Sequence, residues 1–557
     1  MEPERSAPLA AAPPVEGAGR AMLARRARVV SGAVLASRVL GLVREQVFAV
    51  CFGAGRELDA FVTAFRIPNL LRDLFAEGAL SAAFVSTFAQ RLERDGEASA
   101  WRLANLVVNA LAVVVGVLTL VGIWATPAIV DAIAPGFAAI PGKTALTVSL
   151  TRVMFPFLLL VALAAVAMGI LNTRNVFGVP ALASAFFNVG SIVGGLGCAA
   201  WLAPEYLRAV VDRTALANDG TLAARAMTGM AIGTLVGGLL QLLVQFPSLR
   251  RVGFRYRALL DVRDPGLRQV LRLMAPATIG AAAVQVNVFV NNNFASYLGD
   301  GPVSWLNVAF RFMQLPIGLF GVAIGTVTLP IVSRQSARGD TAALGRTVAQ
   351  ALELVALLCL PAAAALAVLG VPVIGLVYEH GRFLPADTTA AAQALAGYAL
   401  GLAGYAAIKV LAPAFYALDD ARVPALVSLF SIAVNYALNW MLVRRLGFGH
   451  VGLALATSAV ALANCALLWV MLRQRIGPFG EHLGRVLARI TAATGLMAAV
   501  VWILDAVLSG VLPGPAAVHH ALRLAIAAPL GAVVFWGACR VLGVPLPTRL
   551  LGQRGAR

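Results

Sequence analysis

The stretch LANLVVNALAVVVGVLTLVGIWATPAIVDAI, residues 103–133, decides the class of the fold. Its only ionisable side chain is Asp131, close to its end. A run of about 20 apolar residues is long enough to cross the hydrocarbon of a bilayer as a helix. Comparable apolar segments follow one another along the chain, about fourteen in all, with short polar gaps between most of them. The sequence therefore predicts an all-α polytopic membrane protein with about 14 transmembrane helices.

The composition excludes the other broad classes. Of 557 residues, 60% are hydrophobic and 13% are charged, and the mean hydropathy is +0.84. A soluble protein has about a quarter of its residues charged, so a soluble multi-domain enzyme is excluded. The alternating decamers of a membrane barrel are not seen. The five cysteines form no CxxC pair and are interpreted as small core residues rather than as a disulfide framework or metal site.

The net charge of +18 is explained by cations on cytoplasmic loops, which set the topology of a membrane protein. We therefore predict that the protein does not bind nucleic acid. An even number of spans places both termini on one side of the membrane. With the N-terminus inside, the inside segments carry about three times as many Lys and Arg as the outside segments. This bias predicts that both termini are cytoplasmic.

An internal repeat divides the chain. Phe65-Arg66 recurs as Phe310-Arg311, and the VPAL-x-S motif of 179–184 recurs at 423–428, both at an offset of about 245 residues. Each half then holds six spans, so the two lobes are expected to be related by a pseudo-two-fold axis along the membrane normal. That arrangement is typical of transporters whose substrate path lies between the halves. The last two spans have no counterpart.

The predicted organisation follows from these segments. It comprises a disordered cytoplasmic tail (1–28), an N-lobe of spans 1–6 (29–247), a basic cytoplasmic loop (248–268), a C-lobe of spans 7–12 (269–473), spans 13 and 14 (474–545) and a cytoplasmic C-terminus (546–557). The polar insert 204–225 is interpreted as an extra periplasmic hairpin or amphipathic turn.

Cations inside the proposed spans are the main candidates for function. They are Arg38, Arg44, Arg66, Arg72, Arg152, Arg311 and Lys409. Each costs roughly 2.5–3.5 kcal/mol at the bilayer centre and needs a partner, a wet cavity or a ligand. Arg66 and Lys409 are the two for which snorkelling to the interface is the simpler interpretation. A guanidinium offers phosphate oxygens a planar fork of donors, so an anion-binding cavity is one hypothesis.

Acids near these cations support a second hypothesis, in which the cluster consists of internal ion pairs. They are Glu45, Asp59, Asp73 and Glu77. Glu45 lies seven residues after Arg38, on the same helical face. Both hypotheses stay open from the residues alone.

Weaker signals complete the set. Asn435 and Asn439 share a helical face and, with Thr457, could ligate a small cation or form interhelical hydrogen bonds. The run 291–293, three asparagines, is interpreted as a polar vestibule or cap, and the histidines at 380, 519 and 520 as solvated loop residues. Nucleotide-binding and nucleophile–base motifs are missing from any credible context, so we predict that the chain is not an enzyme.

The stretch SRVLGLVREQVFAVCFGAGRELDAFVTAFRIPNLLRDLFAEGALSAAFV, residues 37–85, resembles the MurJ/MviN family of lipid II flippases. These proteins act in bacterial peptidoglycan synthesis and share a superfamily with the multidrug MATE transporters. The resemblance continues at APGF (134–137), FPFLLL (155–160), GILNT (169–173), GVAIGT (321–326), EHGRF (379–383) and KVLAPAFY (409–416). It implies fourteen helices in two six-helix lobes plus two C-terminal helices.

The resemblance also implies roles for individual residues. Arg38, Arg44, Arg72 and Arg311 match the family's cavity arginines, which are thought to take a diphosphate headgroup, and Asp59 and Glu77 match acids tied to gating. The family's sodium site would fall near Asn435, Asn439 and Thr457. A groove formed by the last two helices would hold the polyprenyl tail.

The sequence departs from the family pattern at two of these places. Asn439 stands where some members have Asp, which weakens the case for ion binding. Phe310 and Gln314 replace an expected Asp and Glu beside Arg311, leaving that cation less neutralised.

The expected function is a lipid II flippase that moves the undecaprenyl-diphosphate-linked precursor from the inner to the outer leaflet by alternating access. Flexing is expected at Gly41, Pro68, Gly78, Pro316 and Gly321. The alternatives are an exporter of another polyprenyl-linked glycan or a drug, and a non-transporting scaffold for cell-wall synthesis. We expect no cofactor, with coupling to membrane potential or a monovalent cation. The expected partners are lipid II, membrane lipids and cell-wall synthesis proteins, and the expected form is a monomer in the bacterial inner membrane.

Overall fold

The computed structural model describes residues 16–72, 79–479, 482–512 and 514–545. Side chains are described from residue 32 onward, except at 79–82, 215, 217 and 275–284. The described residues are helical apart from turns and short connections, which confirms the all-α class. Eleven of the described helices are long and apolar enough to cross a membrane. Helices also occupy the described parts of the predicted spans 1, 2 and 7, and the total of fourteen stays a prediction.

The first half of the chain forms one bundle, called here the N-terminal bundle. It comprises α1 (Glu16–Phe52), α2 (Arg56–Arg72), α3 (Ala79–Ile133), η2 (Pro135–Ala139), α4 (Lys143–Met154), α5 (Phe157–Thr173), α6 (Gly178–Leu202), α7 (Pro204–Asp212), η3 (Ala215–Asn218), α8 (Gly220–Leu243) and α9 (Phe246–Arg251). Within α3, Gly96 breaks the helix with φ 80° and ψ 178° between two predicted spans.

The second half forms the C-terminal bundle. It comprises α10 (Pro265–Ser296), α11 (Pro302–Pro316), the π-helical turn η4 (Ile317–Gly321), α12 (Val322–Ala337), α13 (Thr341–Val368), α14 (Gly370–Tyr378), α15 (Pro385–Ala417), α16 (Arg422–Asn439), η5 (Trp440–Arg445) and α17 (Gly449–Ile476). The last two helices are α18 (His482–Val511) and α19 (Ala516–Val541). They pack against α13 and α14, on the side of the C-terminal bundle that faces away from the N-terminal bundle.

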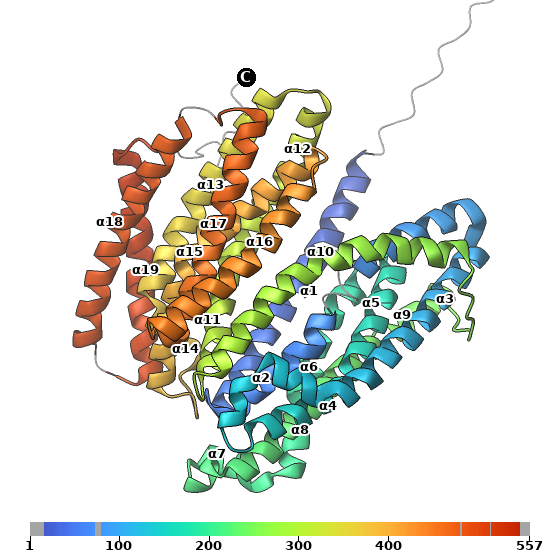
Figure 1. Cartoon of the computed structure of the whole chain (residues 1–557), viewed down its shortest axis with the longest axis horizontal. Helices are drawn as coiled ribbons and strands as arrows, with labels where there is room; N and C mark the ends of the chain where they lie inside the picture. The colour runs from blue at the N-terminus through green and yellow to red at the C-terminus, as the bar shows by residue number, and fades with distance from the viewer. Residues whose placement is uncertain (1–15, 73–78, 480–481, 513, 546–557) are drawn as a thin grey trace, which may run out of the picture.

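The two bundles meet at one end of the molecule and diverge toward the other (Figure 1). Helix α10 crosses between them, because it begins against α3 and ends beside α16. The start of α1 lies at the end where the bundles diverge. That end is called the inner end below, and the end where the bundles meet is called the outer end.

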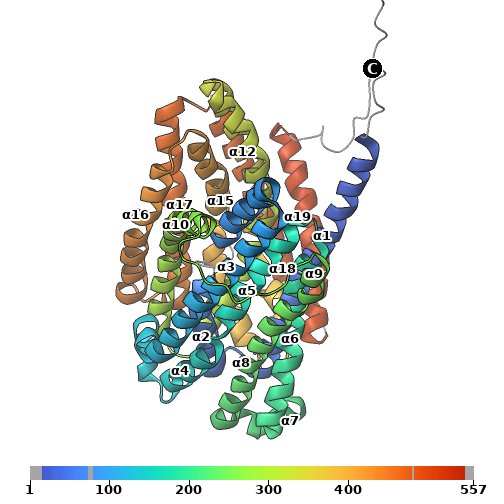
Figure 2. The ribbon, with the colours of Figure 1, turned by 90° about the vertical axis from the view of Figure 1, so that its right-hand side faces the viewer.

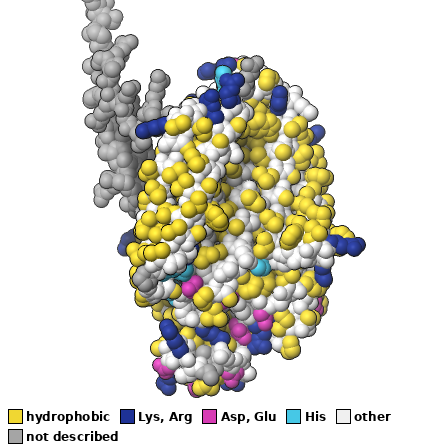
Figure 3. Space-filling model, turned by 90° about the vertical axis from the view of Figure 1, so that its left-hand side faces the viewer, with side chains coloured by type: hydrophobic (Ala, Val, Ile, Leu, Met, Phe, Trp, Pro, Cys, Tyr) yellow, Lys and Arg dark blue, Asp and Glu magenta, His cyan; other side chains and the backbone are white. Residues whose placement is uncertain are grey.

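Local sequence explains how these helices begin and pack. Asp219, Asp264 and Asp340 each accept hydrogen bonds from backbone N–H groups in the first turn of α8, α10 and α13. Helices α6 and α8 approach closely through glycines, since a Cβ added at Gly190 would lie 2.9 Å from the Cα of Gly237. Hydrophobic side chains cover much of the face drawn in Figure 3, and most of its charged side chains gather toward the two ends.

One predicted boundary is corrected. Helix α1 begins at Glu16, so residues 16–28 are helical rather than part of a disordered tail. This segment is rich in Ala and Arg, which favour helix.

Candidate functional site

A cavity of about 160 Å³ lies where α1 and α2 face α11 and α14. Its charged lining residues are Arg44, Glu45, Arg66 and Arg311. Arg44 and Arg66 come from the N-terminal bundle and Arg311 comes from the C-terminal bundle. Cations from both halves of the chain therefore share one space with a single carboxylate. This cavity is called the arginine chamber below.

Glu45 is shared among several groups in the chamber. Its carboxylate forms an ion pair with Arg311 and lies 3.5 Å from Nη2 of Arg44. Tyr378 donates its hydroxyl to the second oxygen at 3.4 Å. The ion-pair hypothesis is thus correct for part of the cluster, although the partners are Arg44 and Arg311 rather than Arg38. One carboxylate cannot neutralise three guanidiniums, so the chamber keeps an excess of positive charge.

Arg66 joins the two bundles through a buried partner, so snorkelling to the membrane surface is not needed to account for its position. Its Nη1 donates to Oδ1 of Asn292 at 2.8 Å, and Asn292 is 1% exposed. Asn292 in turn donates to the carbonyl of Ile133 at 3.4 Å. The repeated Phe-Arg pair was the signal that could have identified Arg66 as a chamber residue.

The other two predicted cavity arginines lie beside the chamber rather than in its lining. Arg38 is exposed, and its Nη1 is 4.0 Å from the position that a Cβ would take at Gly318 in η4, so it faces the opposite bundle. Arg72 is the last residue of α2 and is half-buried, close enough to Arg44 to repel its charge. The structure therefore brings Arg44 and Arg311 into one lining, with Arg38 and Arg72 at its approaches.

Asp59, predicted to act in gating, lies fully buried between the two bundles. Oδ2 accepts from Nζ of Lys143 at 3.0 Å and from the backbone N–H of Gly301 at 2.7 Å. Oδ1 accepts from the N–H and hydroxyl of Ser304, at 2.8 and 2.6 Å. Lys143 also donates to Oδ1 of Asp300 at 2.8 Å. Asp59 thus caps the N-terminus of α11 from the other bundle.

Lys143 falls between two predicted spans, and hydropathy alone does not indicate that its side chain is buried. Its side chain has no exposed surface. A lysine is buried only when it is paired, and here two carboxylates and the carbonyl of Gly299 surround its ammonium group.

The contacts between α2 and α11 follow the internal repeat. Asp59 bonds to Ser304, and the two residues are 245 positions apart, the offset of the repeat. Arg66 and Arg311 have the same separation and line the same chamber. In a two-fold arrangement, a residue contacts its own counterpart only near the axis. The axis that relates the two halves therefore passes between α2 and α11.

A second set of contacts closes the outer end between 50–53 and 381–382. The N–H of Arg382 donates to the carbonyl of Val50 at 3.0 Å. Gly53 and Gly381 both have positive φ, 66° and 62°, and face the opposite segment so closely that no Cβ would fit. Together with the Asp59 network, this contact is called the outer seal below.

The insert 204–225 takes part in the outer seal. It contains α7, whose Tyr206 and Ala209 are buried while Val211 is 79% exposed. The guanidinium of Arg382 donates to Tyr206 Oη at 2.8 Å and to Asn218 Oδ1 at 3.3 Å. The insert is thus a helical turn that receives an arginine from the opposite bundle.

The predicted cation ligands Asn435, Asn439 and Thr457 come together through Asn291. Oδ1 of Asn291 accepts from Asn439 at 2.8 Å and from Asn435 at 3.1 Å. Its Nδ2 donates to Thr457 Oγ1 at 3.0 Å. Interhelical hydrogen bonds are therefore present, and Oδ1 of Asn439 is buried without a hydrogen-bond partner among the described residues. The asparagine run 291–293 was predicted to form a polar vestibule or a cap. Asn292 and Asn293 donate to the last carbonyls of α3, as a cap does, and Asn291 bonds to α16 and α17.

An apolar groove lies at the place implied for the lipid tail. It has a volume of about 210 Å³ and runs between α13, α18 and α19. Its lining residues include Leu357, Pro361, Met497, Val501, Gly531 and Phe535. All thirteen of its lining residues are apolar, so the groove offers no partner to a charged group.

Two polar residues near this groove are buried. His520 is 6% exposed and lies 3.4 Å from Glu379, so it is not a solvated loop residue. Arg523 falls within the last predicted span, and the structure shows it buried in α19, where it forms two hydrogen bonds with Asp505, at 2.8 and 2.6 Å. These bonds form because a hairpin places α18 and α19 side by side.

The remaining predictions divide between described and undescribed residues. Glu77 and Gly78 lie outside the described residues. Pro316 ends α11 directly before the π-helical turn η4, which ends at Gly321, so regular helix is interrupted where flexing was predicted. Across the described part of the chain, no group of three His, Cys, Asp or Glu residues could hold a metal ion.

Comparisons with known proteins give a consistent result. A family model described as "Lipid II flippase MurJ" matches residues 48–514. A lipid II flippase MurJ of Burkholderia cenocepacia is 37% identical over 457 residues, covering 81% of this chain and 84% of the relative. A probable lipid II flippase MurJ of Vibrio cholerae is 34% identical over 537 residues, covering 93% and 96%.

Solved structures agree on the fold. One described as lipid II flippase MurJ in an inward closed conformation has a TM-score of 0.71 at 24% identity, covering 92% of this chain and 98% of the other. An inward-facing MATE multidrug transporter has a TM-score of 0.65 at 15% identity, covering 82% and 99%.

Proposed function

The chain belongs to the MurJ family of lipid II flippases, and from that premise we propose that it moves lipid II across the membrane by alternating access. The physical problem is to carry a charged diphosphate headgroup through about 30 Å of hydrocarbon. A cavity lined by guanidiniums replaces part of the hydration that the headgroup loses. The polyprenyl tail can stay in lipid throughout.

One observation carries this proposal. Arg44, Arg66 and Arg311 line a single chamber between the bundles and share only one carboxylate, Glu45. The chamber lies next to the outer seal, since Ser304 belongs both to its lining and to the Asp59 network. A headgroup that enters between the diverging ends of the bundles would meet these cations before the seal opens. Arg38 and Arg72 supply further positive charge on that route.

The groove between α13, α18 and α19 supports the same proposal for the tail. Its lining is apolar, which suits a polyprenyl chain, and it lies on the outer side of the C-terminal bundle. We propose that the headgroup occupies the arginine chamber while the tail follows this groove.

For orientation, we propose that the inner end faces the cytoplasm of a bacterium. The excess of Lys and Arg on the predicted inside segments supports this topology. We further propose that the chain acts as a monomer beside cell-wall synthesis proteins, since the chamber and outer seal are built from one copy of the chain.

Coupling to a monovalent cation is proposed at the amide cluster around Asn291. The oxygen of Asn439 that has no hydrogen-bond partner among the described residues would serve as a ligand beside the hydroxyl of Thr457. The amides and hydroxyl that form the cluster are uncharged, so a bound cation would be held by neutral oxygens. Transport into vesicles should then slow when sodium is replaced by choline, and the Thr457→Val variant should lose that response.

The decisive experiment is complementation of a bacterium depleted of its own flippase, with accumulated lipid II as the readout. Wild-type protein should restore growth and clear lipid II. Arg311→Ala should fail at normal protein level, because the cation from the second bundle is gone. Arg225→Ala, which removes an exposed arginine of α8, is the matched control and should complement.

Three results would contradict the proposal. Growth supported by Arg311→Ala with normal lipid II turnover would favour a scaffold that transports nothing. Wild-type protein that restores growth while lipid II still accumulates would also favour a scaffold. Wild-type protein that fails to complement but exports another lipid-linked glycan would favour a related exporter.

A further inference from the structure

A second cavity lies on the N-terminal bundle, and the proposed transport path does not use it. It has a volume of about 830 Å³ and lies between α3, α5, the end of α8 and the segment that follows α9. It shares no lining residue with the arginine chamber. Figures 1 and 2 place α3, α5 and α9 on the side of this bundle that is turned away from the C-terminal bundle. In a membrane, that side faces lipid.

One wall of this cavity is a connecting segment that two asparagines hold in place. The segment, residues 252–259, is called the strap. Asn105 of α3 accepts from the N–H of Arg257 at 2.6 Å and donates to the carbonyl of Arg255 at 3.1 Å. Asn109, one turn further, donates to the carbonyl of Arg257 and accepts from Tyr256 Oη, both at 2.8 Å. The two side-chain amides bond to backbone N–H and C=O groups of the strap, as the backbone of a neighbouring β-strand would. These bonds fix the position of the strap, and with it this wall of the cavity.

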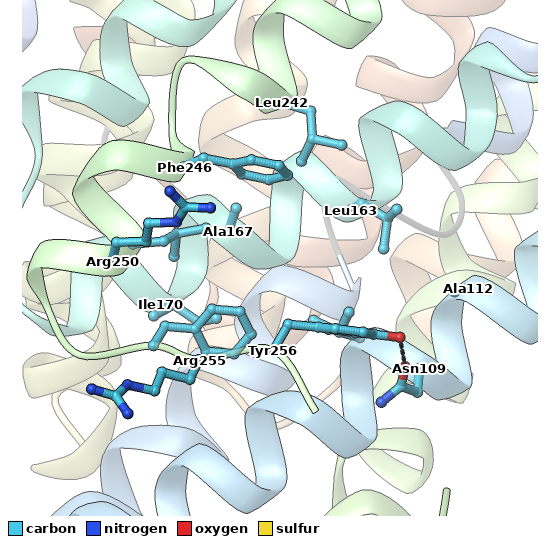
Figure 4. Close-up of a pocket in the computed structure, with 13 residues that line it drawn as sticks. Asn109, Ala112, Leu163, Ala167, Ile170, Leu242, Phe246, Arg250, Arg255 and Tyr256 are labelled. Atoms are coloured by element: carbon cyan, nitrogen blue, oxygen red, sulfur yellow. Dashed lines mark hydrogen bonds between the residues drawn. The ribbon is translucent and has the colours of Figure 1, made fainter. Parts of the chain in front are cut away.

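The lining of the cavity has an apolar part and a cationic part. The apolar part includes Val108, Leu163, Ala167, Ile170, Leu242 and Phe246. Arg250 and Arg255 lie on the same side of the cavity but apart from each other, whereas the Tyr256 ring reaches across to Asn109 (Figure 4). A pocket of 300–1,000 Å³ with mostly apolar walls and a few polar groups is typical of ligand sites.

Arg250 and Arg255 are exposed, and neither forms an ion pair with a described residue. The nearby acids are already engaged, because Asp264 pairs with Arg91 and Asp261 pairs with Arg102. Two guanidiniums at the mouth of an apolar cavity complement a ligand that joins a phosphate to a hydrocarbon chain.

We propose that this cavity binds an anionic phospholipid from the leaflet at the inner end. One acyl chain would lie between α3, α5 and α8, and the headgroup would lie at the mouth of the cavity, where Arg250 and Arg255 supply positive charge. The basic segment 250–272 concentrates anionic lipid at this surface, and the cavity gives one molecule a defined place. The site is separate from the transport path and does not depend on the proposed substrate.

The test uses native mass spectrometry on the purified, delipidated full-length protein. The probes are phosphatidylglycerol and phosphatidylcholine with identical acyl chains, so that only the net charge of the headgroup differs. We expect a preference of about tenfold for phosphatidylglycerol, lost in the variant Arg250→Gln/Arg255→Gln. The matched control Arg251→Gln/Arg263→Gln removes the same charge from exposed residues of the same segment that do not line the cavity, and should keep the preference.

Two further arms distinguish a lipid site from general attraction to a basic surface and from a site for free phosphate. Ala112→Phe narrows the apolar part at a half-buried position and should reduce retention of phosphatidylglycerol severalfold. Inorganic phosphate should not displace the lipid. The proposal is overturned if wild-type protein shows no preference, if both double variants lose it equally, if Ala112→Phe retains as much lipid as wild type, or if inorganic phosphate displaces the lipid.

Discussion

Asp59 and Glu45 are both carboxylates held by cations at the meeting of the two bundles, yet their surroundings differ. Asp59 has no exposed surface and accepts four hydrogen bonds, including one from the equally buried Lys143. Glu45 is 13% exposed and is shared between Arg44 and Arg311, and the side chain of Arg311 is 44% exposed. In the outer seal, charge is matched and water is excluded. In the chamber, cations exceed acids and remain accessible.

This difference separates a gate from a binding site. A carboxylate with every lone pair engaged holds two bundles together and offers nothing to a ligand. A carboxylate outnumbered by guanidiniums orients them and leaves positive charge for an anion. Both arrangements include residues of α2 and α11, because Asp59 and Ser304 belong to the outer seal while Arg66 and Arg311 line the chamber.

Breaking the outer seal should have the largest effect. Lys143→Met leaves Asp59 buried without its cation, which costs about 3–5 kcal/mol for a pair of this kind. A single cysteine at Ser296, 1% exposed between α10 and η2, reports opening when the five native cysteines are replaced by alanine. Maleimide labelling at this position should be at least about 100-fold faster in Lys143→Met than in its parent.

Arg208→Met is the matched control, because it removes an exposed cation from α7 at the same end. Unchanged labelling in Lys143→Met would show that the Asp59 network does not close the outer end. The double variant Asp59→Asn/Lys143→Met should be less destabilised than the sum of its single variants, since no unpaired charge remains.

The outer seal also shows where sequence reasoning reaches its limit. The spans follow from hydropathy, and the repeat, which puts Arg66 and Arg311 at equivalent positions in the two halves, follows from the recurring Phe-Arg and VPAL-x-S motifs. Lys143 was invisible as a buried residue, because its partners are 84 and 157 positions away. His520 was interpreted as a solvated loop residue for the same reason, since its partner Glu379 follows α14, far away in the sequence. The sequence shows that a cation lies near the end of a span. Whether its side chain is buried depends on how helices distant in the sequence pack around it.

Glu45 gives the complementary lesson. Its position on the face of Arg38 favoured a pair with that residue, yet its partners are Arg44 on the same helix and Arg311 and Tyr378 on the opposite bundle. The departures at Phe310 and Gln314 were informative, because a carboxylate at either position would compete with Glu45 for Arg311.

Adding a methyl group at Gly381, in the outer seal, should have the next largest effect. Gly381 has φ 62°, and a Cβ there would collide with the carbonyl of Val50. Gly381→Ala should lower stability by about 1–3 kcal/mol and speed Ser296→Cys labelling accordingly. Gly55→Ala, with no atom within 4 Å of its Cβ position, is the matched control in the same region. Equal effects of the two substitutions would mean that the 381–382 contact contributes nothing to closure.

Removing the single carboxylate of the arginine chamber should have the third largest effect. Glu45→Gln removes the acid that Arg44 and Arg311 share and leaves their cations unpaired. Affinity for inorganic pyrophosphate, measured by calorimetry, should rise about tenfold. Glu57→Gln removes a half-buried acid paired with Arg56 outside the chamber and should leave affinity unchanged. A fall in affinity would show that Glu45 prepares the site rather than opposing the anion.

The smallest effect concerns the inner end, where Asp264 joins the start of α10 to α3. Burial alone would raise the pKa of Asp264, but Arg91 and the N–H groups of Leu267 and Gly266 outweigh it and hold the pKa below its ordinary value. A lowered pKa in the folded state adds stability above the unfolded pKa of about 3.9, and this stability is lost as pH falls through the folded pKa.

Asp264→Asn should therefore lower the Tm at pH 7 by a few degrees and flatten its fall below about pH 4. Asp261→Asn breaks the exposed pair with Arg102 and should shift the Tm little at any pH. If the Tm of Asp264→Asn falls below about pH 4 as steeply as that of the wild type, another group causes the loss of stability in acid. In that case α10 is held at the inner end by apolar packing against α3 alone. The inner end would then be joined weakly, whereas the outer end is joined by the buried network of the outer seal. A transporter needs this difference if its bundles separate first on the side where substrate enters.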